Sequence, residues 1–334
     1  MNARSRTWLA GLAVVAIFLA VQLGSLALIE SFETSYGPVV EDTGDPVNSG
    51  IFFGVILVAT AIMLLAFRYD ADRFIRLLIV GVSAMLSWYV FAALFPSVVV
   101  SGVDIVAALA AVGIGVALLS YPEWYVIDAA GVLMAAGAAT LFGISFGPLP
   151  ALLFLSVLAV YDAISVYRTE HMLSLADGVF DLKIPVVFVV PTTRSYSYLV
   201  DDGPLEGVDD TSADGNSNAE HSADSDADGD ADPSDDSVRD ALFIGLGDAV
   251  IPTILVVSAA SFLDVPAVDL PGLTVNVPAL GAIAGTTVGL VILLRMVLRG
   301  RAHAGLPLLN GGAIAGYLLG ALASSVPLAT AIGL

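Results

Sequence analysis

The sequence predicts an all-α polytopic membrane protein with nine transmembrane helices, a short β segment and a disordered acidic loop between helices six and seven. Of its 334 residues, 57% are hydrophobic and the mean hydropathy is +0.91, which is too apolar for a soluble domain. The apolar residues fall in runs of about 20, the length of a helix that crosses a bilayer. The lipid bilayer is therefore the first partner that the sequence implies.

Nine apolar runs account for the predicted helices. The first run is longer than the apolar core of a secretory signal, and no convincing cleavage site follows it, so we expect a retained helix. Each of the others has the length and composition of a membrane span. The nine runs cover residues 7–29, 50–67, 74–95, 103–120, 125–146, 148–167, 241–263, 274–298 and 305–332.

A polar segment, residues 201–240, separates the sixth run from the seventh. It holds 15 of the 32 acidic residues and almost no apolar ones, so it cannot bury a core and is predicted to be disordered. It divides the chain into a six-helix part, residues 1–200, and a three-helix part, residues 241–334. Just before it, residues 185–190 form a β-branched run bounded by prolines. This run fits either a strand or a membrane-surface segment without fixed structure.

The positive charges predict how the chain is oriented. With nine spans, all twelve basic residues fall on one side of the membrane, and the opposite loops carry acidic residues alone. Since positive charge accumulates on the cytoplasmic side, the N-terminus and the loop between helices six and seven are predicted to be cytoplasmic in a multi-pass protein of the cell membrane. The twelve are Arg4, Arg6, Arg68, Arg73, Arg76, Arg168, Lys183, Arg194, Arg239, Arg295, Arg299 and Arg301.

The overall composition excludes several classes of function. The net charge of -20 and the single lysine suit a high-salt cytoplasm, which indicates a halophilic archaeon, and they argue against nucleic-acid binding. The absence of cysteine excludes thiol catalysis and disulfides. There is no His-Glu-x-x-His motif, which argues against a zinc protease. We expect neither a metal nor an organic cofactor, and the sequence names no obligate partner subunit.

Two aspartates, Asp162 and Asp248, lie inside apolar runs. A carboxylate at membrane depth costs about 2.5–3.5 kcal/mol on insertion scales, so its presence is read as functional. Counted at 1.5 Å per residue, both lie roughly 9–12 Å below the cytoplasmic ends of their helices, so antiparallel neighbours would place them side by side. Two such carboxyls do not both ionise easily, so one can act as general acid and the other as general base on a water. A structural or proton-relay pair is the alternative.

Glycines accompany one of these aspartates. Gly245 and Gly247 precede Asp248 and permit close approach of another backbone. A third carboxyl, Asp128, lies a few residues into the fifth run, where we expect interfacial water to reach it. Other glycines recur at four-residue spacing in the last two runs and predict helix-packing faces. They are Gly281, Gly285 and Gly289 in one run and Gly312, Gly316 and Gly320 in the other.

Tyr161-Asp162 in the sixth run, together with Gly245-Leu246-Gly247-Asp248 in the seventh, resembles the presenilin and signal peptide peptidase group of intramembrane aspartyl proteases. The nine spans and the long hydrophilic loop fit this group, and the stretch 161–191 looks especially like its archaeal presenilin homologues. The resemblance implies that Asp162 and Asp248 are the catalytic pair of an intramembrane aspartyl endopeptidase. It also implies that Tyr161, Gly245, Leu246 and Gly247 belong to the active-site motif.

The resemblance also implies residues that position the substrate. The family carries a Pro-Ala-Leu motif at the start of the last span, close to the aspartates. The match by position is Ala304-Gly305-Leu306-Pro307, in which Ala304 and Gly305 replace the proline and the alanine; Pro278-Ala279-Leu280 has the letters but lies at the external entrance of the eighth span. In the family a strand after the sixth span pairs with the unwound substrate. The candidate strand here is 185–190, with Val187, Phe188 and Val189.

A proton- or cation-coupled membrane transporter is the competing function, because the same acidic pair could bind a proton or a cation. Transporters often show inverted repeats and helices broken at the midplane of the membrane. No such repeat is visible here, and the aspartates lie nearer the cytoplasmic face. The favoured hypothesis is therefore hydrolysis of peptide bonds within transmembrane segments of membrane proteins.

Overall fold

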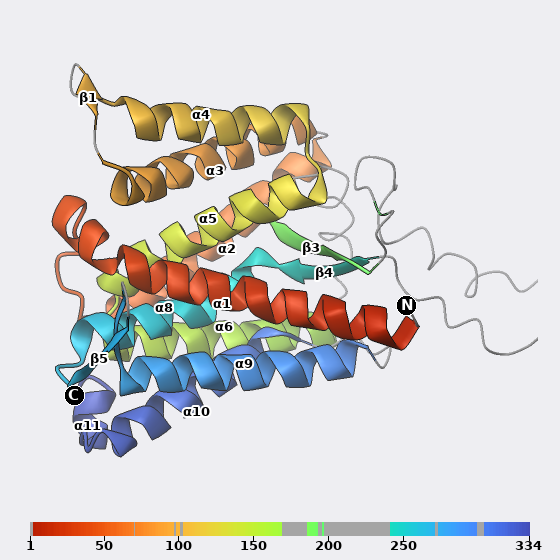
Figure 1. Ribbon diagram of the computed structural model, residues 1–334. Helices are drawn as coiled ribbons and strands as arrows, with labels where there is room; N and C mark the ends of the chain where they lie inside the picture. Colours follow the sequence, from red (N-terminus) through yellow and green to blue (C-terminus); the bar gives the residue numbers. More distant parts are fainter. Residues whose placement is uncertain are drawn as a thin grey trace, which may run out of the picture.

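The described residues fold into a bundle of apolar helices with three two-stranded sheets (Figure 1). In the described residues, seven helices are long and apolar enough to cross a membrane, and two further apolar helices have 16 and 17 residues. This confirms the predicted all-α membrane fold. The computed structural model describes residues 3–69, 71–96, 98–100, 103–168, 186–192, 196, 241–270, 273–298 and 304–334. The predicted disordered loop, 201–240, lies outside these residues.

Within the described residues of the N-terminal part there are six helices, joined by short connections. A small hairpin, β1 (Val99–Val100) with β2 (Val103–Asp104), precedes the fourth helix, whose first N–H groups are capped by the Asp104 carboxylate. The helices are α1 (Ala3–Ser35), α2 (Val47–Arg68), α3 (Asp72–Leu94), α4 (Ile105–Ser120), α5 (Trp124–Ser145) and α6 (Pro148–Arg168).

The C-terminal part contains α8 (Leu246–Phe262), α9 (Val277–Val297), α10 (Leu306–Ala323) and the short α11 (Leu328–Ala331). The hairpin of β5 (Ala267–Leu270) and β6 (Leu273–Asn276) connects α8 to α9. The Asn276 side chain accepts from the Ala279 N–H at 2.9 Å and donates to the Ala259 carbonyl at 2.6 Å. One side chain therefore caps α9 and ties it to the end of α8.

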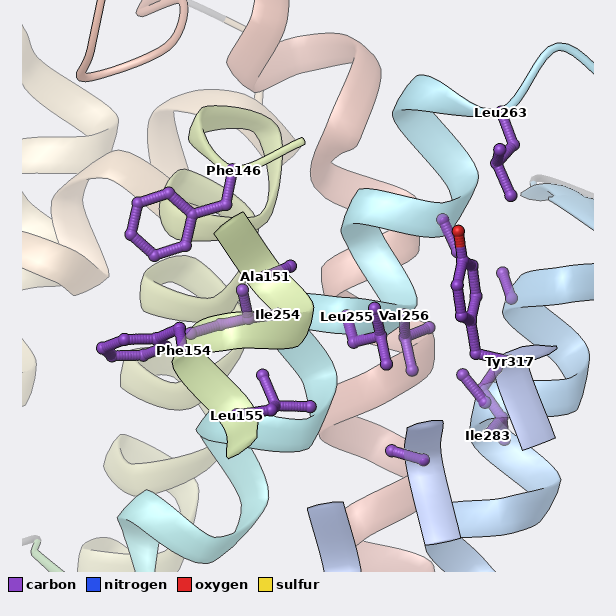
Figure 2. Packing of buried hydrophobic residues seen from close by; sticks show 14 of the residues in the cluster. Phe146, Ala151, Phe154, Leu155, Ile254, Leu255, Val256, Leu263, Ile283 and Tyr317 are labelled. Atoms are coloured by element: carbon purple, nitrogen blue, oxygen red, sulfur yellow. The ribbon is translucent and has the colours of Figure 1, made fainter. Parts of the chain in front are cut away.

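Helix α8 lies at the centre of the bundle and packs against α1, α5, α6, α9 and α10. Its residues from Pro252 to Ala259 are all buried, so it has no polar face, as expected for a helix surrounded by other helices. Figure 2 shows Leu255 and Val256 of α8 between Leu155 of α6 on one side and Tyr317 of α10 on the other. The two parts of the chain therefore share one core.

The glycine repeats of α9 and α10 bring these two backbones into direct contact. A Cβ on Gly285 would lie 2.0 Å from the Gly312 carbonyl oxygen, and one on Gly281 would lie 2.2 Å from the Gly316 carbonyl oxygen. No side chain fits at such distances. The predicted packing faces are confirmed, and they hold the start of α10 close to the end of α9, where a Cβ on Gly289 would meet the Leu308 carbonyl at 2.3 Å.

Residues 187–190 of the predicted run form part of a strand in the structure. Strand β3 (Val187–Pro191) pairs antiparallel with β4 (Ala241–Gly245), with Val189 opposite Phe243. The sheet lies at the end of the bundle that also carries the N-terminus, while β5 and the C-terminus lie at the opposite end (Figure 1). Residues on both sides of the long loop thus meet in one small sheet.

The predicted spans and the observed helices differ in their bounds, most of all at the seventh and the last span. The seventh span was predicted from 241, but residues 241–245 are strand β4 and the helix begins at Leu246. The fourth helix begins at Ile105, and the last ends at Ala323 before the short α11. The predicted depth of Asp248 assumed a helix that begins at residue 241. Asp248 instead lies in the first turn of α8. Its position beside Asp162 therefore depends on tertiary contacts and not on matched depth along two helices.

The backbone contact between α9 and α10 predicts that Gly285→Ala destabilises the protein. The added methyl cannot fit beside the Gly312 carbonyl without parting the helices, which costs about 1–3 kcal/mol or more. The matched control is Gly311→Ala on α10, where a Cβ meets nothing within 4 Å and helix propensity favours alanine. Unfolding in detergent, followed by circular dichroism, checks both variants. Equal stability of the two would contradict the proposed backbone contact.

Candidate active site

Asp162 projects from the C-terminal half of α6, and its carboxylate meets the first turn of α10. The side chain is 8% exposed, and its Oδ2 accepts a hydrogen bond from the Leu306 N–H at 3.0 Å. Leu306 is the first residue of α10, so this N–H has no partner within its own helix. The Asp162 carboxylate therefore lies at a helix N-terminus, where negative charge is stabilised.

Asp248 lies in the first turn of α8, directly after strand β4, and it is partly buried. The N-terminal end of α8 favours a negative charge at this position as well. One turn later, Pro252 has no N–H to donate to the Asp248 carbonyl, which loosens the hydrogen bonding of this first turn. Each aspartate thus lies at the N-terminus of a helix. Asp248 is at the start of its own helix, α8, and Asp162 is beside the start of the neighbouring α10.

The segment Gly305-Leu306 brings the two carboxyls together. Leu306 donates to Asp162, and the adjacent Gly305 lies against Asp248, because a Cβ on Gly305 would be 3.2 Å from the Asp248 Oδ2. Both aspartates line the same small cavity. One turn further along α10, the Asn310 side chain donates to the Leu155 carbonyl at 2.9 Å and fixes α10 on α6. The position-matched Ala304-Gly305-Leu306-Pro307 segment is therefore at the aspartates.

The two aspartates face a cavity of about 210 Å³ with mostly apolar walls. Strand β4 forms one wall, the C-terminal end of α9 forms another, and Gly305 lies on a third side. The apolar walls exclude bulk water from most of the carboxyl surface, which strengthens electrostatic interactions inside. The lining residues are Asp162, Val166, Leu242, Phe243, Ile244, Gly245, Asp248, Leu293, Leu294, Val297 and Gly305.

The other motif residues are placed less directly. Gly245 lines the cavity, and a Cβ there would be 3.5 Å from the Asp248 Oδ2. Leu246 donates its N–H to the Val186 carbonyl at 2.9 Å and so ties α8 to the strand. Gly247 is exposed in the first turn of α8. The ring of Tyr161 lies against Phe53 of α2, with centroids 5.7 Å apart.

The register of the sheet shows which strand edge faces the cavity. Neighbouring residues of an antiparallel pair alternate between bonding the partner strand and pointing away from it. Because the 186–246 pair is bonded, the 187–245 and 189–243 pairs point outward. Gly245, whose outer backbone groups point away from β3, lines the cavity.

Strand β3 pairs with β4 on one edge and is bonded to Asp128 on the other at Val189, and the expectation that 185–190 offers its edge to a substrate stays a prediction. The register pairs Phe188 with Ile244 of β4. The Val189 N–H, which points away from β4, is bonded to the Asp128 carboxylate at 2.8 Å. Phe188 and Val189 are each 1% exposed. The strand that lines the cavity beside the aspartates is β4.

Asp128 lies against β3 and lines a second cavity, of about 730 Å³, together with Arg6, Trp124 and Val190. We expected interfacial water to reach it, and the side chain is 9% exposed. The sequence places it one turn into a helix, and only the arrival of β3 from a distant part of the chain covers it. The Pro278-Ala279-Leu280 triplet starts α9 and contacts Gly320 near the end of α10, at the opposite end of that helix pair from Gly305.

The apolar walls of the cavity were not predicted from the sequence. Leu293, Leu294 and Val297 are ordinary residues of an apolar span, and no local signal distinguishes them from their neighbours. Alternation along Leu242–Ile244 is too short to reveal a strand. Among the described residues, no group of three or more His, Cys, Asp or Glu side chains is arranged to hold a metal ion. The titratable side chains that line the cavity are the two carboxyls of Asp162 and Asp248.

The contact of Gly305 with Asp248 predicts that Gly305→Val lowers the expected peptidase activity by roughly 100-fold, the usual cost of displacing a catalytic group by about 1 Å. Gly305→Ala adds a smaller group and should lower activity much less. The measurement is kcat/KM on one substrate for both variants and the wild type. Gly113→Val is the control, because a Cβ there meets nothing within 4 Å. Equal activity of Gly305→Val and wild type would show that Gly305 does not set the Asp248 position.

Comparisons with known proteins agree with this geometry. The family model "Signal-peptide peptidase, presenilin aspartyl protease" matches residues 15–326. Two solved structures of a presenilin family intramembrane aspartate protease, in space groups C222 and P2, are similar to this chain, and each is 32% identical to it. The first covers 94% of this chain and 99% of that chain, with a TM-score of 0.61; the second covers 93% and 97%, with a TM-score of 0.59. No curated protein gave a sequence match.

The match spans nearly the whole chain and includes both helices that carry the aspartates. It favours the protease over a proton- or cation-coupled carrier as the reason for two carboxyls within apolar helices. The chain therefore belongs to the signal-peptide peptidase and presenilin family and is a multi-pass intramembrane aspartyl endopeptidase.

Proposed function

We propose that Asp162 and Asp248 are the catalytic pair and that they hydrolyse a peptide bond of a transmembrane segment through one water. The observation that carries this assignment is the joint contact of Gly305-Leu306 with both carboxyls. The ionised carboxyl takes a proton from the water as its oxygen attacks the scissile carbonyl carbon. The protonated carboxyl gives its proton to the carbonyl oxygen, which forms a tetrahedral diol.

The second half of the reaction uses the same two groups in reverse. The carboxyl that gained a proton donates it to the amide nitrogen, and the C–N bond breaks. The other carboxyl takes back a proton from the diol, which restores the carbonyl of the new carboxylic acid. The pair returns to one protonated and one ionised group, so no cofactor is needed for the balance.

The outer edge of β4 suits an unwound substrate. A helical peptide bond is shielded by its own hydrogen bonds, and within a bilayer its freed N–H and C=O groups must find new partners. Addition of the substrate as a strand to β4 supplies them. A substrate strand that pairs with β4 as far as Gly245 passes close to Asp248, because Asp248 is only three residues further along the chain. The cavity of about 210 Å³ is small for a peptide, so binding must move some of its apolar walls.

The catalytic assignment predicts that Asp162→Asn and Asp248→Asn each abolish cleavage while the protein stays folded. An amide can neither give nor take the proton, and its burial costs less than that of a charge. The assay uses purified protein in detergent and a tagged single-span membrane protein, with products identified by mass spectrometry. Asp104→Asn is the control, since it keeps the cap of α4 far from the cavity. Substantial cleavage by either purified single variant would rule out the pair.

The charge distribution predicts a cytoplasmic N-terminus and a cytoplasmic loop between α6 and α8. The chain has no cysteine, so single cysteines report topology without background. We expect Ser217→Cys, in that loop, to react with a membrane-impermeant maleimide only after the cells are opened. Glu41→Cys, between α1 and α2, should react in intact cells. The reverse labelling pattern would place the active-site end of the bundle outside the cell.

A further inference from the structure

Asp128 is a buried carboxylate that the catalytic mechanism does not use. It lies in the second turn of α5, and its side chain is 9% exposed. Burial of a carboxylate is costly unless hydrogen bonds compensate for the lost water. The compensating partner that the structure gives is the Val189 N–H, at 2.8 Å from Oδ1.

This hydrogen bond closes one edge of the sheet. The register directs the Val189 backbone groups away from β4, so the carboxylate occupies the place that a further strand would take. Strand β3 is therefore bonded by β4 on one side and by α5 on the other. Edges with unpaired N–H groups invite additional strands, and a carboxylate acceptor removes that opportunity at Val189.

Helix α5 is also shaped to receive the strand beside Asp128. Gly131 lies one turn further along, and a Cβ there would be 2.9 Å from the Phe188 ring and 3.3 Å from Leu246 Cδ1. The ring thus takes the space of a missing side chain. Ile127 and Ala130 of the same helix pack with Val189 in one buried cluster. Two neighbouring strand residues are therefore held by α5, one through its N–H and one through its ring.

The strand is linked in turn to the catalytic residue. The Val186 carbonyl accepts the N–H of Leu246 at 2.9 Å, and Leu246 is the first residue of α8. Asp248 follows two residues later, in the same first turn. A shift of β3 would therefore shift β4, the first turn of α8 and the Asp248 carboxyl together. Asp128 on α5 holds β3 in place through its hydrogen bond with the Val189 N–H.

We propose that Asp128 is a positioning residue for proteolysis: its carboxylate closes the outer edge of β3 and fixes the β3–β4 sheet, so that a substrate strand adds at β4 in one register relative to Asp248. The proposal rests on the proposed function for its catalytic consequence. Its structural core is the carboxylate bonded to the strand edge, which exists whether or not the protein is cleaving a substrate.

Four variants of the full-length protein test the proposal. Asp128→Asn keeps an oxygen acceptor for the Val189 N–H, and Asp128→Ala removes it. Val189→Pro removes the donor from the other side, and since this N–H points away from β4, the β3–β4 ladder is left intact. Asp104→Ala is the control, since it removes a carboxylate that caps α4 in another part of the bundle.

The first readout is hydrogen–deuterium exchange of the peptide that contains residues 186–192, which needs no substrate. We expect exchange at Val189 to accelerate by about tenfold in Asp128→Ala, the effect of losing one hydrogen bond, and to stay near wild type in Asp128→Asn and Asp104→Ala. Unchanged exchange in Asp128→Ala would overturn the proposal. This outcome can be read even if wild-type protein cleaves nothing, so it is distinguishable from a failure of the proposed function.

The second readout is the set of cleavage sites in a tagged single-span substrate, mapped by mass spectrometry together with kcat and KM. Asp128→Ala and Val189→Pro should raise KM about fivefold to tenfold and add cleavage sites beside the wild-type one, because the register is no longer fixed. The double variant should be no worse than the single ones, since both remove the same bond. Asp128→Asn should restore the wild-type sites.

Two outcomes would contradict the positioning role. A lower rate with unchanged KM and unchanged cleavage sites in Asp128→Ala would mean that the residue supports folding alone. Equal impairment in Asp128→Asn and Asp128→Ala would mean that the hydrogen-bond acceptor is not what matters. If Asp128→Ala does not fold, Asp128→Asn and Val189→Pro still decide the question, because the one keeps the acceptor and the other removes only the donor.

Discussion

The contact of one short segment, Gly305-Leu306, with two carboxyls is the constraint on which the rest of the structure depends. Leu306 donates its N–H to Asp162, and Gly305 leaves the space that the Asp248 carboxyl occupies. The two aspartates come from helices separated by the long acidic segment, and neither contact is local in sequence. Any rearrangement that moves the start of α10 would change the surroundings of both carboxyls at once.

The surrounding packing makes this contact rigid. The α9 and α10 backbones touch through their glycines, so α10 cannot slide or tilt without a clash. Asn310 holds α10 on α6, and α8 is buried by five neighbouring helices. A pair of carboxyls in an apolar setting repels itself and loses water, so its geometry persists only where packing over-determines it. The glycine contacts between α9 and α10 and the packing around α8 hold the two carboxyls in this geometry.

The sheet adds a second level of organisation around the same site. Strand β4 forms a wall of the cavity and continues directly into α8, while β3 anchors it to α5 through Asp128 and the Phe188 ring. A membrane protein can expose backbone groups at depth only where they line a cavity or face protein. The outer edge of β4 meets this condition because it faces the cavity that the aspartates share.

The sequence by itself determined the apolar helices and the two aspartates, because hydropathy is a local property and a carboxylate within an apolar run stands out without any structure. It also pointed to the segment 304–307 through its position in the chain. Tertiary structure decided whether Leu242–Ile244 is helix or strand, since a short apolar run suits both and its pairing with β3 settles the choice. It also decided the burial of Asp128 and the meeting of Gly305 with Asp248. These depend on contacts between distant segments, which no local pattern encodes.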